Sequence, residues 1–189
     1  MDLNSEEKKL KIVVLGDGFY LRALTVDDCS ETYLSWLNDV EINQYLETRH
    51  WAQDIDAIKA FVQSSNSSND TFLFGIFIDI LNLHIGNIKI GPIHPIYKHA
   101  DMSYFIGDKR YHGKGLMSNV IKEIQRFAFD QLGLIKLKAG VTVTNTGSEK
   151  CLLKNGFNKV AQYRNEVLNI KNEWEDVLVL ECLKESEKQ

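Results

Sequence analysis

The sequence predicts an α/β fold in which a mixed central β-sheet is flanked by helices. Two groups of apolar runs of strand length, before residue 107 and after residue 135, surround one long stretch with a helical period. A glycine-bearing loop joins the first group of strands to that helix. At 189 residues the chain is long enough to bury its own core. We therefore expect a single domain over residues 1–189, with residues 1–10 as a leader outside the core.

The composition excludes several classes of protein. Hydrophobic residues make up 44% of the chain and charged residues 25%, with a net charge of −4, so no basic patch for nucleic acid is indicated. No apolar run approaches the length that crosses a membrane, and the charged N-terminus lacks the apolar core of a signal peptide. The three cysteines and five histidines have neither disulfide nor metal spacing. We expect a cytoplasmic protein without metal, membrane or nucleic-acid partner.

The N-terminal part predicts a hairpin followed by a helix. Strands at 12–15 and 19–23 are joined by Gly16-Asp17-Gly18, which is typical of a hairpin turn. Thr25 is a helix-capping residue type, and Asp28 stands at the reciprocal position of a capping box. The sequence therefore predicts a helix that starts at Thr25 and runs to about Leu37.

A second helix and the main sheet follow. The helix is expected over 54–63, with Ile58, Phe61 and Val62 facing inward, and the polar stretch 64–70 is expected to be a solvated loop. Further strands are expected at 71–80, 84–90, 100–107, 135–144, 157–163 and 173–183, with helices from Leu116 to Ala128 and from Ser148 to Asn155.

The loop before the long helix has the features of a pyrophosphate site. The first turn of a helix has backbone N–H groups without helical partners, the helix dipole adds positive charge, and glycines let a ligand approach closely. A P-loop is excluded because Asp108 stands where its first glycine is needed, and a dinucleotide fingerprint because Ser118 stands at its third. The pattern that remains is Arg110-x-x-Gly113-x-Gly115.

This pattern resembles motif A of the GNAT acyl-CoA N-acyltransferase family, whose loop holds the coenzyme A pyrophosphate. Asn145-Thr146-Gly147-Ser148 and then Lys154-Asn155-Gly156-Phe157 resemble the family's later N-x-x-S and K-x-G-F helix, in the right order. The family's order of strands and helices can be laid over roughly residues 19–183. The resemblance implies the GNAT fold, with a sheet splayed at the acyl-CoA site, and transfer of an acetyl group from acetyl-CoA to a primary amine.

The resemblance also implies which residues bind acetyl-CoA. Pantetheine would lie in the splayed gap like an added strand, with its amides bonded by the backbone of the strand that leads into the loop. The loop and the first turn of its helix would face the pyrophosphate, and the loop asparagine of the second motif would contact pantetheine or cap its helix. The expected residues are Phe105, Ile106, Gly107, Arg110, Tyr111, His112, Gly113, Lys114, Gly115, Leu116, Met117, Ser118 and Asn145.

Acetyl transfer needs a group that takes the proton of the attacking amine. We expect Asp101 to be this base, because the family often has a carboxylate on this strand; an exposed residue at the strand end is the alternative. Tyr104, further along the strand, would bond a bridging water or only pack. His84 and Glu47 are weaker candidates for the base.

The leaving thiolate needs a donor. Many family members have a tyrosine four residues before the glycine of K-x-G-F, but here that position is Leu152. The RimJ/RimL-like branch, the ribosomal-protein N-terminal acetyltransferases, also has an apolar residue there and uses the serine of the motif, which is Ser148. We expect Ser148 to act on the thioester or else only to cap its helix.

The acceptor amine is expected at the opposite mouth of the gap. The W-L-N-D…Y-L-E-T-R run resembles acetyltransferases of surface-glycan synthesis, which implies an amino group on a nucleotide-linked amino sugar as the acceptor, with Arg49 facing the diphosphate. The alternatives are a protein N-terminus and a degenerate protein that binds acyl-CoA without turnover. A homodimer is also expected from the family. The expected substrate residues are Trp36, Asn38, Tyr45, Glu47, Arg49, His50 and His84.

Overall fold

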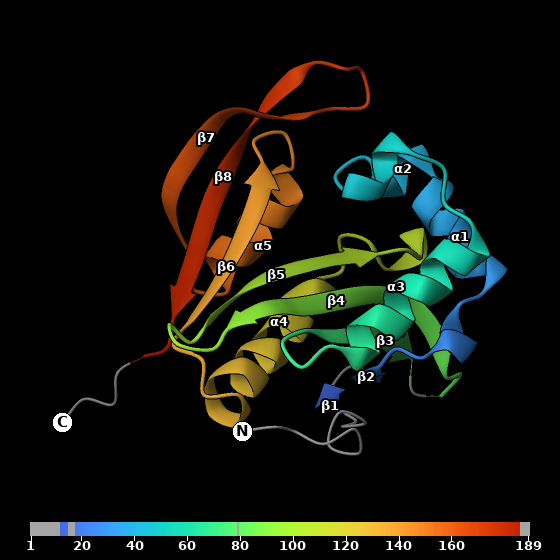
Figure 1. The fold of residues 1–189 in the computed structure, drawn as a ribbon, viewed down its shortest axis with the longest axis horizontal. Helices are drawn as coiled ribbons and strands as arrows, with labels where there is room; N and C mark the ends of the chain where they lie inside the picture. Colours follow the sequence, from blue (N-terminus) through green and yellow to red (C-terminus); the bar gives the residue numbers. More distant parts are fainter. Residues whose placement is uncertain (1–11, 15–17, 79, 186–189) are drawn as a thin grey trace.

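The computed structural model describes residues 12–14, 18–78 and 80–185. Within them, eight strands form one sheet in the order β1-β2-β3-β4-β5-β6-β8-β7 (Figure 1). The expected leader at 1–10 and most of the first hairpin turn lie outside the described residues. The strands are β1 Ile12–Val14, β2 Phe19–Ala23, β3 Phe72–Ile78, β4 Leu83–His94, β5 His99–Ile106, β6 Lys136–Thr142, β7 Asn158–Leu168 and β8 Trp174–Leu183.

Helices connect these strands and cover both faces of the sheet. Figure 1 shows α3 and α4 on opposite faces, and α5 beside β6. The helices are α1 Glu31–Asn38, α2 Val40–Asn43, α3 Ile55–Ser67, α4 Leu116–Arg126 and α5 Thr146–Lys154, with short 3₁₀ turns at η2 Val26–Asp28, η3 Glu47–His50 and η4 Lys109–Tyr111 and a π-helical segment at η5 Phe127–Gln131.

The apolar strand β3 organises the core because both of its faces are buried. Phe74 belongs to a cluster with residues of α4, whereas Leu73 and Phe77 belong to a second cluster with residues of α1 and α3. A strand covered on both faces is a continuous apolar run rather than an alternating one. The prediction of a mixed α/β sheet with flanking helices is confirmed.

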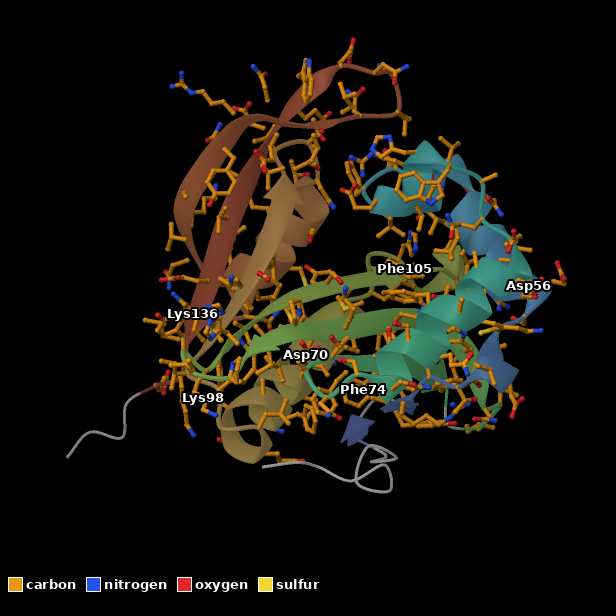
Figure 2. The ribbon with its side chains drawn as sticks, viewed as in Figure 1. Asp56, Asp70, Phe74, Lys98, Phe105 and Lys136 are labelled. Atoms are coloured by element: carbon orange, nitrogen blue, oxygen red, sulfur yellow. The ribbon has the colours of Figure 1, made fainter. Side chains whose placement is uncertain are left out.

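The sheet is split at its centre. All strand pairs in the described residues are antiparallel except β5 and β6, which pair in parallel only from His99 to Asp101 against Lys136 to Lys138. Beyond that seam β5 and β6 diverge (Figure 1). Figure 2 shows Lys98 and Lys136 at the closed end and Phe105 at the far end of β5, near the N-terminal helices. The expected splay is therefore present.

Two N-terminal predictions about local structure were wrong. Thr25 and Asp28 do form a capping box, but it starts only the 3₁₀ turn η2, and the helix proper begins after a second cap at Ser30, whose Oγ accepts from Tyr33 N. The predicted helix from Thr25 to Leu37 is thus broken in two. The break follows from a tertiary contact, because Arg22 bonds both carboxylate oxygens of Asp28 at 2.7 and 2.6 Å.

Helix α3 is longer than predicted and presents a different face. It continues to Ser67, into the stretch expected to be a solvated loop. Ser65 is buried, and Asn66 Nδ2 donates to Leu24 O at 2.9 Å, so contacts with the body of the protein hold this polar turn in place. Ile58 and Val62 are buried as predicted, but Phe61 is 45% exposed and does not face inward.

Candidate active site

A cleft of about 650 Å³ opens where β5 and β6 separate. Its walls come from β5, β6, α5, the loop before α4 and the segment around α2. The residues that line it are Glu41, Ile42, Gln44, Tyr45, Leu46, Met102, Ser103, Tyr104, Phe105, Ile106, Tyr111, His112, Gly113, Gly115, Leu116, Met117, Ser118, Ala139, Gly140, Val141, Asn145, Gly147, Ser148, Lys150, Cys151, Leu152 and Lys154.

The glycine loop fits a pyrophosphate. Gly113 and Gly115 have φ angles of 69° and 78°, a left-handed conformation that glycine adopts without steric cost. A Cβ at either position would meet no atom within 4 Å, so the space beside both glycines is open to the cleft. Because α4 begins directly after Gly115, its first N–H groups lie at the same place.

The cations of the loop lie at its outer side. Arg110 is 72% exposed and forms an ion pair with Asp108, with Nη2 2.6 Å from Oδ2. Lys114 Nζ lies 5.6 Å from the centre of the Tyr111 ring. Neither Arg110 nor Lys114 lines the cleft, whereas Tyr111 does. The two cations therefore lie on the outer side of the loop and not on the surface that faces the cleft.

His112 folds back onto the end of β5. Its Nε2 lies 2.8 Å from the carbonyl oxygen of Ile106, so this nitrogen donates the bond. Phe105, Ile106 and His112 all line the cleft. The Ile106 carbonyl thus already has a partner, which was not expected from the sequence.

Gly107 already uses its backbone N–H within the protein. It is buried, its N–H donates to Ile85 O at 2.8 Å, and a Cβ there would lie 2.0 Å from the Trp36 ring. Its amide is therefore used by the protein itself and is not available to pantetheine. The glycine is needed for the close approach of the Trp36 indole.

The first turn of α4 is held from inside the core. Leu116 and Met117 are buried and also line the cleft, and Ser118 Oγ accepts from Asn155 Nδ2 at 3.0 Å. This bond joins α4 to the end of α5. The structure thus gives the Ser118 side chain a role in packing and leaves the backbone of this turn at the cleft.

Tyr104 and Ser148 meet across the cleft. Tyr104 comes from β5 and Ser148 from the first turn of α5, and their hydroxyl oxygens share a hydrogen bond of 2.7 Å. Burial raises the pKa of the Tyr104 phenol well above its usual range, although the bond to Ser148 opposes this. The Tyr104 phenol is therefore neutral, and the hydroxyl of the pair whose proton is not used in their shared bond can donate into the cleft.

Two further α5 residues complete this wall. Asn145 caps the helix, since its Oδ1 accepts from Ser148 N at 3.1 Å, and it also lines the cleft. Cys151 lies one turn after Ser148, and burial raises the pKa of its thiol, so the thiol stays protonated. Asn145 therefore positions Ser148 through the backbone of its helix.

Asp101 lies outside the cleft. It stands in the closed seam opposite Lys138, and its carboxylate lies 3.3 Å from the Lys138 ammonium and is 58% exposed. The expectation that Asp101 faces the amine is thus not met by its position. Among the described residues that line the cleft, Glu41 is the one carboxylate; its Oε2 lies 2.5 Å from Lys109 Nζ.

Two of the expected substrate residues belong to the core instead. Trp36 is 6% exposed and packs with Phe105 and with His84, whose ring centre is 5.1 Å away. His84 Nε2 lies 2.7 Å from Asn87 Oδ1, and burial lowers the pKa of this histidine despite that bond. Neither Trp36 nor His84 lines the cleft, so both act as packing behind Phe105.

The remaining expected substrate residues differ in position. Tyr45 lines the cleft. The Asn38 side chain instead bonds both the backbone N–H and the backbone carbonyl of Gln53, each at 3.0 Å, and so joins α1 to the segment before α3.

Glu47 and His50 are exposed residues of η3. The side chain of Arg49 is buried, and its guanidinium bonds backbone carbonyls of Leu46 and Leu168. An arginine held in this way does not face a nucleotide diphosphate.

Several lining residues were not predicted. Lys150 and Lys154 are four residues apart on α5 and both reach the cleft, a spacing that places them on one face and that was visible in the sequence. Glu41, Gln44 and Leu46 could not be predicted, because the segment around α2 has no clear period. Their position depends on how this segment packs against the end of β5.

The described residues offer neither a cluster of metal ligands nor a membrane-spanning helix. They contain no group of three or more His, Cys, Asp or Glu side chains that could hold a metal ion. None of the helices among them is long and apolar enough to cross a bilayer.

Known proteins resemble this chain in sequence and in fold. The model of the acetyltransferase (GNAT) domain family matches residues 19–158. "Probable N-acetyltransferase YjcK" of Bacillus subtilis (strain 168) is 33% identical over 128 residues, which cover 67% of this chain and 70% of that protein.

Among solved structures, the spermidine N-acetyltransferase from Vibrio cholerae in complex with CoA and spermine superposes with a TM-score of 0.80 at 21% identity, covering 89% of this chain and 96% of that one. A GNAT-family acetyltransferase from Bacillus anthracis gives 0.76 at 17%, covering 92% and 98%. These two likenesses show the fold. With the family match over most of the chain, they complete the assignment: the chain belongs to the GNAT family and is an N-acetyltransferase that uses acetyl-CoA.

Proposed function

We propose that this enzyme transfers the acetyl group directly to a primary amine of a small molecule, at the hydroxyl pair formed by Tyr104 and Ser148. The observation that carries the proposal is the 2.7 Å hydrogen bond between these side chains, which bridges the cleft between β5 and α5. The pair lies in the same cleft as the glycine loop, so donor binding and chemistry share one channel.

Acetyl-CoA, when bound, supplies the acetyl group as a thioester, from which the amine nitrogen displaces the CoA thiolate. The backbone around Gly113 and Gly115 holds the pyrophosphate, and Lys150 and Lys154 of α5 add positive charge to the same cleft. The hydroxyl of the pair whose proton is not used in their shared bond donates a hydrogen bond to the departing sulfur, which leaves as the thiol once it has gained the proton that the amine loses.

The proton acceptor proposed here is Glu41 rather than Asp101. Glu41 is at the mouth of the cleft formed by the α2 segment, where an amine would enter. Lys109 holds its carboxylate in place, with Asp39 as a second partner 2.8 Å from the same ammonium. A water between Glu41 and the amine would carry the proton the remaining distance.

The first candidate acceptor is an amino group on a nucleotide-linked amino sugar, as the sequence around Trp36 and Tyr45 suggests. Tyr45 supports it, because it is an aromatic residue at the cleft wall beside the polar Gln44. The buried positions of Trp36 and Arg49 weaken it. A polyamine is a further small-molecule candidate, since the structural relative from Vibrio cholerae is a spermidine acetyltransferase.

The second candidate acceptor is the α-amino group of a protein. Ser148 favours it, because this serine stands at the cleft as in the branch that acetylates ribosomal proteins, with the apolar Leu152 one turn later. The third possibility, binding without turnover, is separated from both by measuring the released thiol.

The experiment measures CoA release from acetyl-CoA with a UDP-linked amino sugar, spermidine and a short peptide with a free N-terminus as acceptors. We expect amine-dependent release with a small-molecule acceptor and its loss in Ser148→Ala. If only the peptide supports CoA release among the three acceptors, the substrate is a protein and not a small molecule. Thermal stabilisation by acetyl-CoA without release for any acceptor would refute the transfer proposal in favour of a binding protein.

A further inference from the structure

Two segments far apart in sequence close over the acceptor end of the cleft. One runs from α2 through η3, and the other is the β7–β8 hairpin with the loop between β6 and α5. Figure 1 shows α2 facing this hairpin across the top of the gap between β5 and β6. Tyr45 Oη donates to Thr144 O at 3.4 Å, and Arg49 reaches Leu168 at the end of β7.

Arg49 makes the stronger of these two contacts. Its Nε and Nη2 donate to Leu168 O at 3.1 and 2.9 Å, while Nη1 donates to Leu46 O at 2.7 Å. One planar group thus binds a carbonyl on each side. The fork geometry of a guanidinium allows this, and a lysine ammonium has no equivalent.

The burial of this charge indicates that the two segments stay together. The Arg49 side chain is only 3% exposed, and the nearest carboxylate is that of Glu47, 3.6 Å away and itself 75% exposed. A buried cation is costly unless it is hydrogen-bonded, and here the two carbonyls accept from all three nitrogens of the guanidinium. Separating the walls would leave the guanidinium buried on one side without its partner, so the contact favours the closed arrangement.

Arg49 joins a residue that lines the cleft to the β7–β8 hairpin beside it. Leu46 lines the cleft directly. Leu168 pairs with Trp174 at the start of β8, and the neighbouring Glu175 accepts from Thr144 Oγ1 at 2.9 Å. The contacts therefore form a continuous ring from η3 to the hairpin, to the β6–α5 loop and back through Tyr45.

We infer that Arg49 is a positioning residue that joins the two walls into a closed portal, and that this portal admits small amines rather than a chain lying across both walls. The inference rests on the proposed function for the identity of the acceptor, but the closure itself is a property of the fold. Arg49 acts through Leu46 and Leu168 and needs no contact with the reacting atoms.

The closure is tested first by amide hydrogen exchange, which requires no substrate. In Arg49→Met we expect faster exchange at 44–51 and at 166–172 together, because both segments lose their shared partner. Arg126→Met is the matched control, since Arg126 is a 67% exposed arginine of α4 paired only with Glu123 on its own helix in the described structure. Unchanged exchange at 166–172 in Arg49→Met would overturn the closure.

The effect on specificity is then measured with the amine that the acceptor panel identifies. Loss of a charge-assisted bond at the wall is expected to raise KM for the amine about tenfold, with KM for acetyl-CoA unchanged. Amine-independent hydrolysis of acetyl-CoA should rise because water enters. Equal changes in both KM values would refute a role at the acceptor end.

Arg49→Lys keeps the charge and removes the planar set of guanidinium donors, so it is the variant to measure if Arg49→Met does not fold. It is expected to show the same pattern to a smaller degree, and wild-type exchange and kinetics in this variant would refute the need for the guanidinium. If no amine is acetylated, the proposed function fails, while the exchange experiment still decides the closure.

Discussion

Replacing Gly115 by aspartate tests the pyrophosphate loop most directly. The left-handed φ of 78° is one that aspartate and asparagine tolerate better than other residues, and the added side chain meets no protein atom within 4 Å at its Cβ. The fold should therefore survive. Gly115→Asn has the same shape without the charge. Gly133→Asp is the matched control, because Gly133 has a φ of 64° and equally open space but does not line the cleft.

The expected magnitude follows from the new charge. A carboxylate about 4 Å from one phosphate charge costs about 1 kcal/mol if water screens it and about 4 kcal/mol at an effective dielectric constant of 20. The Kd for acetyl-CoA should thus rise by roughly 5-fold to roughly 1,000-fold. At a hundredfold excess over the wild-type Kd, the ligand stabilises the wild type by about 2.7 kcal/mol, or about 5–11 °C in Tm for a chain of this length.

The assay is a thermal-shift titration of acetyl-CoA with the wild type and the three variants. Gly133→Asp should keep the full shift, Gly115→Asp should lose between about a third and nearly all of it, and Gly115→Asn should lose less than Gly115→Asp. The Tm without ligand should fall similarly in Gly115→Asp and Gly133→Asp, since both place a side chain in a left-handed conformation. A full shift in Gly115→Asp would refute the assignment of this loop to the pyrophosphate.

Three other predictions concern the hydroxyl pair and the core behind it. Ser148→Ala should lower kcat about 100-fold with little change in KM for acetyl-CoA, and an unchanged kcat would remove Ser148 from the chemistry. Because burial lowers the pKa of His84, the unfolded state binds a proton first, so the free energy of unfolding should fall as pH drops below about 6.5. Denaturant titrations between pH 5 and pH 8 should show a flatter dependence in His84→Phe but not in His50→Phe. Gly107→Ala should lower the free energy of unfolding by about 1–3 kcal/mol, because its methyl group would overlap Trp36; an unchanged Tm would contradict that contact.

The sequence predicted those parts of the protein whose signals are local. The glycine loop needs two residues in a left-handed conformation before a helix, and glycine, the residue that adopts this conformation most easily, stands at both positions, 113 and 115. The splay was implied by the resemblance that this loop supports. The break before α1 was not predictable, because it depends on Arg22 from a neighbouring strand binding Asp28.

The acceptor end was predicted less well than the acetyl-CoA end. Trp36 and Arg49 are residue types that often bind ligands, and only their packing shows otherwise: Trp36 fills the space above Gly107, and Arg49 bonds Leu168, which is more than one hundred positions away in sequence. Asp101 was predicted on the correct strand, but it lies in the seam where β5 and β6 still pair. The length of that seam cannot be deduced from the sequence.

The short seam between β5 and β6 also limits the shape of the molecule that can lie between these strands. Past Asp101, the five residues from Met102 to Ile106 pair with β4 on one side and present an internal sheet edge on the other. At about 3.3 Å per residue this edge is about 17 Å long. An extended ligand with amides at strand-like spacing can match it, whereas a longer polypeptide strand would collide with β6 at the seam. The sheet thus selects its ligand by length as well as by hydrogen bonding.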